Sequence, residues 1–342
     1  MDMHKKRELR AKKKQTNKED RKDENKNSAP VTINWYPGHM KKTRELIEAN
    51  LKLVDIVVEV VDARIPSSSR NPIIDQIVKD KKRIIFLNKV DLSDEQKNKE
   101  WKKKLERDNT RVVLGNCMLG DGIKQLFAML DKEQEIVNKE KNRNKPLRMM
   151  IVGVPNVGKS SLINRMTGKK STQTGDRPGV TKGKQWISIK NGMQLLDTPG
   201  ILWPKFEDPN VGLNLAFCGS IKDEILDISE LSFNLFKVLL DKYEDMLLKR
   251  YKMEKEEIED REALEIFELV GEKRGFMKKG GNIDYERLSK TILDEFRAAK
   301  IGRITLEEPV VEALEELQEP ESIEDSFEEE KELAEDKPFE EV

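Results

Sequence analysis

The sequence contains few of the residues that build cross-linked or metal-bound folds. Its 342 residues include only two cysteines and two histidines. The two cysteines, Cys117 and Cys218, exclude a disulfide framework and a cysteine-based zinc site, and they fit a reducing compartment. No run of about 18 apolar residues is present, and the N-terminus lacks the apolar core of a secretion signal. We therefore expect a soluble, cytoplasmic protein with no membrane partner.

Charged residues, by contrast, are abundant and unevenly distributed. They make up 38% of the chain, yet the net charge is −1. Residues 1–30 hold 11 Lys/Arg against 6 Asp/Glu, whereas residues 307–342 hold 17 Asp/Glu against 2 Lys. The −15 of the tail leaves +14 on residues 1–306. A basic body is typical of proteins that contact nucleic-acid phosphates. For the two ends, solvated disorder is the alternative interpretation.

A phosphate-binding loop is the clearest motif. Residues 153–160, Gly-Val-Pro-Asn-Val-Gly-Lys-Ser, fit G-x-x-x-x-G-K-[ST] and lie between an apolar run at 147–152 and a helical pattern at 161–166. The amides of such a loop and the helix N-terminus can converge on phosphate oxygens. Lys159 would neutralise the β- and γ-phosphates, and Ser160 would offer its hydroxyl to Mg²⁺.

A second phosphate element follows the apolar run at 193–196. It consists of residues 197–200, Asp-Thr-Pro-Gly. Asp197 stands at a strand end where it can hold the water shell of Mg²⁺, and Gly200 would offer its amide to the γ-phosphate.

The base-reading element is predicted at residues 88–91, Asn-Lys-Val-Asp, directly after the apolar run at 83–87. Ligands bind at the carboxyl ends of strands in open α/β sheets. There the carboxylate of Asp91 can accept from guanine N1–H and the 2-amino group, donors that adenine lacks. Because a polar site left unpaired discriminates strongly, the sequence predicts GTP over ATP.

The order of these elements predicts a circular permutation, because the base-reading element precedes the phosphate loop and ordinary GTPases have the reverse order. We expect an α/β fold with a parallel-rich sheet, a circularly permuted P-loop GTPase domain, and a smaller all-α C-terminal domain. The expected boundaries are a basic disordered head at 1–30, the GTPase domain at 31–203, the helical domain at 204–306 and an acidic disordered tail at 307–342. The expected strands include 56–61 and 112–114, the expected helices are 71–78, 95–105, 123–137, 228–240 and 283–299, and 138–145 is the expected permutation linker.

The last expected helix has two distinct sides. Leu288, Ile292, Phe296 and Ala299 recur at helical spacing on one face. Basic residues adjoin that face, and a Gly-rich basic loop at 273–281 precedes it. A solvated cationic face is one interpretation and RNA binding is the other. The adjoining basic residues are Arg287, Lys290, Arg297 and Lys300.

The permuted order and residues 34–40, Asn-Trp-Tyr-Pro-Gly-His-Met, resemble the circularly permuted ribosome-biogenesis GTPases, most closely the ribosome biogenesis GTPase A group of bacteria. The likeness covers about residues 33–305. It implies a factor that binds a late precursor of the large ribosomal subunit, contacts its rRNA, and hydrolyses GTP to GDP and phosphate when maturation permits release. The subunit would act as the activator, and we expect the factor to be a monomer.

The resemblance also implies individual roles. Position 201 is Ile where many GTPases carry a water-orienting Gln, so His39 becomes the candidate catalytic group; capping or packing is its alternative role. Asn156 resembles a K⁺ ligand of potassium-dependent GTPases, with a structural turn as the alternative. Thr181 in Pro-Gly-x-Thr is the candidate for Mg²⁺ and γ-phosphate contact and for catalysis beside Lys159, and Thr174 is a weaker contender. Residues 115–117 replace the usual Ser-Ala that approaches guanine O6 through backbone amides. The candidate nucleotide contacts are Asn88, Lys89, Asp91, Asn116, Cys117, Asn156, Val157, Gly158, Lys159, Ser160, Ser161 and Gly200.

Two other functional classes remain possible at this stage. One is a GTP-dependent switch that acts on a protein partner without RNA. The other is a binding module that uses GTP only as a structural ligand, which the missing Gln suggests.

Overall fold

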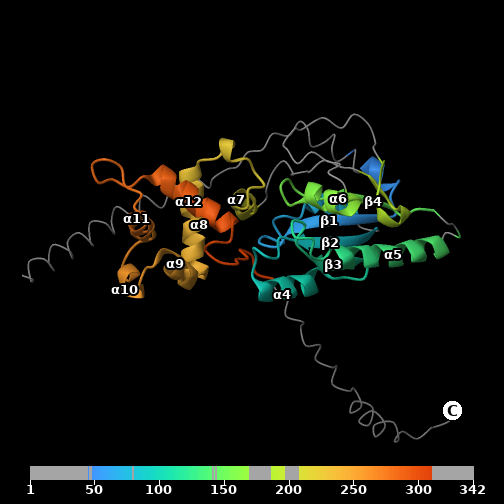
Figure 1. The fold of residues 1–342 in the computed structure, drawn as a ribbon, viewed down its shortest axis with the longest axis horizontal. Helices are drawn as coiled ribbons and strands as arrows, with labels where there is room; N and C mark the ends of the chain where they lie inside the picture. The colour runs from blue at the N-terminus through green and yellow to red at the C-terminus, as the bar shows by residue number, and fades with distance from the viewer. Residues whose placement is uncertain are drawn as a thin grey trace, which may run out of the picture. The chain divides into compact units, whose positions relative to one another are not determined.

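The described strands form one six-stranded sheet (Figure 1). The computed structural model describes residues 45, 48–78, 81–140, 142, 145–168, 186–196 and 208–309. The strand order is β3-β2-β1-β4-β6-β5, and every neighbouring pair is parallel except β5 with β6. The strands are β1 (Ile56–Asp62), β2 (Lys82–Asn88), β3 (Thr110–Leu114), β4 (Arg148–Val152), β5 (Trp186–Ser188) and β6 (Gln194–Leu196). The predicted parallel-rich α/β class is confirmed.

The path of the chain through the sheet makes the permutation visible. The described strands start with β1 in the middle of the sheet and continue outward through β2 to the edge strand β3. Helix α5 (Ile123–Glu140) then leads back to β4, which pairs with β1 on its other side. The base-reading segment after β2 therefore comes before the phosphate loop after β4 in the sequence, although both strands pair with β1.

Helices cover both faces of the sheet because side chains alternate along each strand. Strand β1 is buried at every position. Its Val58 and Val60 belong to the same apolar cluster as buried residues of α5 and α6 (Lys159–Thr167). On the other face, Val57 packs with α3 (Pro72–Ile77) and Val61 with α4 (Glu95–Leu105). A parallel sheet is normally covered in this way.

Two local predictions need correction. The linker expected at 138–145 begins inside α5, which continues to Glu140, because Lys139 and Glu140 are good helix formers and nothing stops the helix before them. Strand β5 was not predicted. It has three residues, which are too few to show an alternating pattern, and it forms by pairing antiparallel with β6.

After β6, the described residues 208–309 contain helices and one isolated bridge between Met277 and Ile283. Aspartates cap three of these helices, since Asp208, Asp227 and Asp284 accept from backbone N–H groups of the first turn. No described helix is long and apolar enough to cross a membrane. The helices are α7 (Pro209–Phe217), α8 (Ile228–Lys242), α9 (Glu244–Tyr251), α10 (Lys255–Ile258), α11 (Ala263–Lys273) and α12 (Tyr285–Arg297), with a 3₁₀ turn at Asp223–Ile225. Another 3₁₀ turn, Lys190–Gly192, lies earlier, between β5 and β6.

The segment that follows α12 returns to the sheet. The Leu306 N–H donates to Arg64 O at 2.8 Å, and the Trp101 Nε1–H donates to Glu307 O at 3.2 Å. The Glu307 carboxylate accepts from the N–H groups of Ser67 and Ser68 at 2.5 and 2.9 Å. The acidic tail was expected to begin at 307, but Glu307 lies against the sheet because these donors pair its charge. The described residues up to Glu308 belong to one compact unit, and the division at 203 remains a prediction.

Candidate nucleotide-binding site

Three loops that carry the predicted motifs leave the carboxyl ends of strands of the sheet. Residues 153–160 follow β4, residues 88–91 start at the last residue of β2, and residues 115–117 follow β3. Strand β1 lies between β2 and β4 and ends at Asp62. The sheet therefore brings the base-reading segment and the phosphate loop to one edge, as the motifs predicted.

The phosphate loop has a backbone that requires glycine. Gly153 and Gly158 have φ of 149° and 108°. A Cβ on Gly158 would lie 2.2 Å from Asn88 Nδ2, and one on Gly153 would lie 2.5 Å from Val60 O. The loop ends at the N-terminus of α6, where Gly158 caps the helix without a side chain. Lys159 reaches back across the loop and donates to Val154 O at 2.6 Å.

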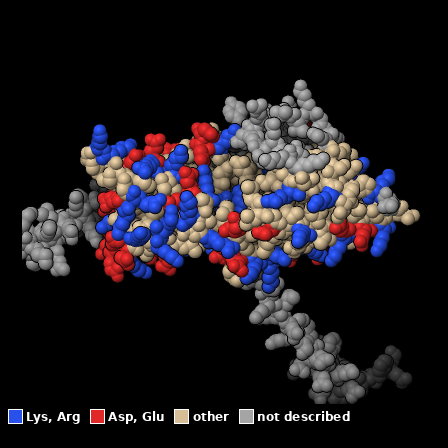
Figure 2. All heavy atoms as spheres, in the orientation of Figure 1, with Lys and Arg blue, Asp and Glu red and all other residues tan. Residues whose placement is uncertain are grey.

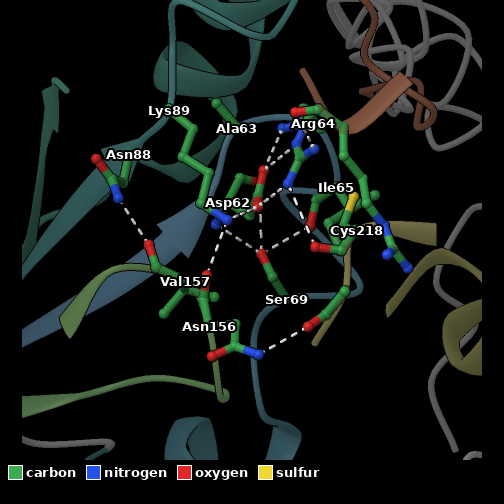
Figure 3. Close-up of polar contacts among 12 residues, drawn as sticks. Asp62, Ala63, Arg64, Ile65, Ser69, Asn88, Lys89, Asn156, Val157 and Cys218 are labelled. Atoms are coloured by element: carbon green, nitrogen blue, oxygen red, sulfur yellow. Dashed lines mark hydrogen bonds and ion pairs between the residues drawn. The ribbon is translucent and has the colours of Figure 1, made fainter. Parts of the chain in front are cut away.

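Asn88 joins the phosphate loop to the loop after β3. Its side-chain Nδ2 donates to Val157 O at 2.7 Å (Figure 3), and its Oδ1 accepts from the Cys117 N–H at 2.9 Å. Asn88 is only 3% exposed. This side chain is therefore committed to holding two loops of the site together.

Lys89 makes a second connection between the loops. Its Nζ donates to Asn156 O at 2.8 Å and pairs with Asp62 Oδ2 at 2.8 Å. Asp62 also forms a two-point ion pair with Arg64. Burial alone would raise the pKa of the Asp62 carboxyl, but Arg64 and Lys89 outweigh it and hold this pKa well below its usual range. The carboxylate is therefore charged when it meets Lys89.

Asp91 differs from these two residues because it is exposed. Its neighbour Val90 is held on both sides, by the Gly115 carbonyl at 3.4 Å and by Arg303 Nη2 at 2.8 Å. The loop is thus fixed while the carboxylate faces outward, as the predicted role in base reading requires.

The loop after β3 uses its amides internally. The N–H groups of Gly115, Asn116 and Cys117 donate to Leu87 O, Asp121 O and Asn88 Oδ1. All three amides are therefore hydrogen-bonded within the protein, and the Cys117 N–H supports the Asn88 side chain. Recognition of guanine O6 by this loop stays a prediction.

The two cysteines lie near this edge as buried thiols. Burial raises the pKa of the Cys117 and Cys218 thiols to about 12. Both are free. Such thiols are chemically inert and act as small apolar groups.

Asn156 lies in the phosphate loop with φ of 59°. Its Nδ2 donates to the carbonyl of Gly219 at 2.8 Å, in the turn that follows α7 (Figure 3). The carboxamide therefore has a fixed orientation, with its donor committed to the helical part of the chain.

Several predicted site residues lie outside the described residues: His39, Thr174, Thr181, Asp197 and Gly200. Sequence reasoning missed the Asp62–Arg64 pair. One signal was available, because Asp62 directly follows six apolar or buried positions at the end of β1.

The cationic side of the last helix is smaller than predicted. Helix α12 ends at Arg297, so Ala299, with φ of 52°, and Lys300 lie beyond it. Arg297 turns inward and donates to Ala216 O and Phe217 O, both at 2.9 Å, because the exposed carbonyls at the C-terminus of α7 need donors. Arg287 and Lys290 remain exposed. The apolar face with Leu288, Ile292 and Phe296 is confirmed as buried.

Two family models match the chain, "50S ribosome-binding GTPase" over residues 148–269 and "RsgA GTPase" over residues 37–207. The chain is 43% identical over 284 residues to ribosome biogenesis GTPase A of Priestia megaterium, which covers 82% of this chain and 98% of that protein. It is 34% identical over 280 residues to ribosome biogenesis GTPase A of Thermotoga maritima, covering 81% and 95%. The crystal structure of GNP-bound YlqF from T. maritima matches with a TM-score of 0.54 and 30% identity, over 79% of this chain and 99% of that chain.

Proposed function

Since the chain belongs to the ribosome biogenesis GTPase A family and is a GTP hydrolase, we propose that it acts in the assembly of the large ribosomal subunit. It binds a late precursor of that subunit as a cytoplasmic monomer and contacts its rRNA. Hydrolysis of GTP drives maturation and release of the factor. The proposal that the site binds a guanine nucleotide is supported by two hydrogen bonds, which Asn88 and Lys89 donate to carbonyls of the phosphate loop.

The oxygen groups of the site fit Mg²⁺, a hard cation that prefers oxygen ligands and substrate phosphates. Ser160 lies in the first turn of α6, where its hydroxyl can bind the metal. Asp197 and Thr181 are proposed as the remaining protein groups. Bound Mg²⁺ would neutralise charge on the β- and γ-phosphate oxygens. Glycine at 153 and 158 lets the loop backbone approach Val60 and Asn88 closely, which fixes the position of the loop amides proposed to meet those phosphates.

His39 is proposed to orient the attacking water, since Ile201 cannot do so by hydrogen bonding. We expect His39→Ala to retain GTP binding and to lower the turnover that large subunits stimulate. Unchanged stimulated turnover would remove His39 from the mechanism.

Asn156 is proposed as a K⁺ ligand beside the transferring phosphate. The hydrogen bond from its Nδ2 to Gly219 O fixes the side-chain carboxamide. The side-chain oxygen Oδ1 is then the atom that would bind a cation. K⁺ would stabilise charge that develops in the transition state. Equal GTPase rates in K⁺ and Na⁺ would refute this role.

The proposed rRNA contact involves the loop between α11 and α12 together with α12. Lys278, Lys279 and Lys290 are exposed there, and the Arg287 guanidinium lies 4.5 Å from the centroid of the Phe276 ring. Figure 2 shows Lys and Arg side chains over this part of the molecule, interspersed with Asp and Glu. Phe276 is only 7% exposed, so the exposed cationic groups, and not the ring, fit RNA, through its phosphates.

The test is co-sedimentation with large-subunit precursors in a non-hydrolysable GTP analogue and in GDP. We expect binding in the analogue, release in GDP, and a steep loss with salt. Lys279→Glu with Lys290→Glu should weaken binding by roughly tenfold or more. The matched control is Lys132→Glu with Lys139→Glu, which reverses two exposed charges on α5. Equal effects of both pairs, or nucleotide-dependent binding to a protein partner without RNA, would contradict the rRNA contact.

A further inference from the structure

A buried ion pair lies outside all the nucleotide motifs. Asp62 and Arg64 are 0% and 2% exposed. Arg64 Nε donates to Asp62 Oδ1 at 3.0 Å, and its Nη2 donates to Asp62 Oδ2 at 2.8 Å. A buried ion pair is weak evidence for stability, because desolvation offsets much of the attraction. Its position at the end of β1, between the base-reading strand and the phosphate-loop strand, suggests a different role.

One end of the pair reaches the nucleotide loops. Lys89 has a left-handed φ of 64°, and its Nζ contacts both Asp62 Oδ2 and Asn156 O at 2.8 Å (Figure 3). A lysine has a flexible four-carbon stem, so a fixed anion is needed to hold its ammonium in one place. Asp62 is that anion, and it holds Lys89 against the phosphate loop.

The other end reaches the helical part of the chain. Arg64 Nη2 lies 3.5 Å from Cys218 O, and its Nη1 lies 3.5 Å from Arg297 O. Its guanidinium is 5.7 Å from the centroid of the Phe296 ring. These groups belong to the turn after α7 and to the end of α12.

The same turn also contacts the phosphate loop directly. Gly219, which follows Cys218, accepts from Asn156 Nδ2 at 2.8 Å. The turn after α7 thus meets the nucleotide site twice, through Asn156 and through the series Arg64, Asp62, Lys89.

We propose that Asp62 and Arg64 are positioning residues of the nucleotide site, which set Lys89 against the phosphate loop and couple its position to the turn after α7 and the end of α12. Because coupling between two sites is reciprocal, nucleotide binding then orders these helical elements, and a partner that holds them changes nucleotide affinity. The inference deepens the GTPase function and rests on guanine-nucleotide binding alone, not on the rRNA contact.

A purely structural ion pair is the competing explanation, and strand β1 supplies a control for it. Glu59 is 1% exposed and pairs with Arg83 at 3.1 Å and with Arg70 at 3.6 Å. In the described structure, the groups beside its carboxyl are Arg70, Arg83 and Asp75, and none of them belongs to the three motif loops. Glu59→Gln therefore removes a buried carboxyl group from the same strand without touching the nucleotide site.

The first experiment measures GDP affinity and urea unfolding of the wild type, Asp62→Asn and Glu59→Gln. The urea concentration at the midpoint of unfolding should differ from the wild-type value in both variants. Only Asp62→Asn should weaken GDP binding, on the order of tenfold, because a charge-assisted contact to Lys89 is lost. An unchanged GDP affinity in Asp62→Asn, or an equal loss in Glu59→Gln, would overturn the inference.

The second experiment follows hydrogen exchange of the wild type with and without GDP, and it stands even if Asp62→Asn does not fold. GDP should slow exchange at the Gly219 and Leu306 amides. Arg64→Lys, which keeps a cation beside Asp62 but loses the two-point geometry, should lose this protection while still binding GDP more tightly than Asp62→Asn. The coupling would be overturned if GDP slowed exchange at these amides equally in Arg64→Lys and the wild type, or if GDP slowed it in neither. A wild type that binds no GDP would overturn the nucleotide site itself, which separates that failure from this one.

Discussion

Asn88 is the side chain on which assembly of the site depends most, and its removal gives a calculable effect. In Asn88→Ala, the buried Val157 carbonyl and Cys117 N–H both lose their hydrogen-bond partner. An unsatisfied buried group costs about 1–3 kcal/mol, so the two together cost about 2–6 kcal/mol. A typical domain has only about 5–15 kcal/mol of stability. We therefore expect a large loss of folding stability and of nucleotide binding.

The assay is urea unfolding of the nucleotide-free protein, followed by circular dichroism. Asn88→Asp keeps an acceptor for the Cys117 N–H but places a carboxylate against the Val157 carbonyl, so it should also be destabilised. The control is Gln96→Ala on the surface of α4, which should change stability by less than about 0.5 kcal/mol. If Asn88→Ala is as stable as Gln96→Ala, the bridge does not hold the loops, and the reasoning is refuted.

Two further predictions follow from perturbed pKa values. Because burial raises the pKa of Cys117 and Cys218 to about 12, a thiol reagent at pH 8 should label neither in the native protein and both in urea; rapid native labelling would contradict their burial. Glu295 is buried, which alone would raise its pKa, but Arg250 and Arg274 outweigh this and lower it. Its stabilising effect is therefore present above the unfolded pKa of about 4 and lost as pH falls below it. The stability difference between wild type and Glu295→Gln, measured by urea unfolding, should shrink from pH 7 to pH 3, and a constant difference would contradict the ion pairs.

The features that the sequence predicts well are those encoded by neighbouring residues. Helix α4 has the predicted bounds, because Asp94 caps its first turn and Trp101 and Leu105 supply its buried face. The phosphate loop is predictable because close approaches of its backbone to Asn88 and Val60 demand glycine at fixed positions. In both cases the physical cause lies within a few residues of the effect.

The missed features depend on residues far apart in the chain. Arg64 meets carbonyls at Cys218 and Arg297, and no local pattern indicates those contacts. Arg297 fits a cationic helix side by periodicity, yet Asp223 and the end of α7 draw it inward. By its sequence Glu307 likewise belongs to an acidic tail. In the structure, the N–H groups of Ser67 and Ser68 donate to its carboxylate and hold it in place. Tertiary contacts override the local pattern at each of these positions.

The most direct test of the account is the nucleotide preference of Asp91→Asn. Asp91 is exposed on a loop that Gly115 and Arg303 hold in place, so its carboxylate should read the guanine donors. Xanthine carries a carbonyl where guanine has its 2-amino group, and an asparagine amide can donate to it. Titration should show that the wild type prefers GDP to XDP by roughly a hundredfold or more and that Asp91→Asn reverses the preference. An Asp91→Asn variant that binds GDP as tightly as the wild type would contradict the assignment of this edge of the sheet as a guanine-nucleotide site.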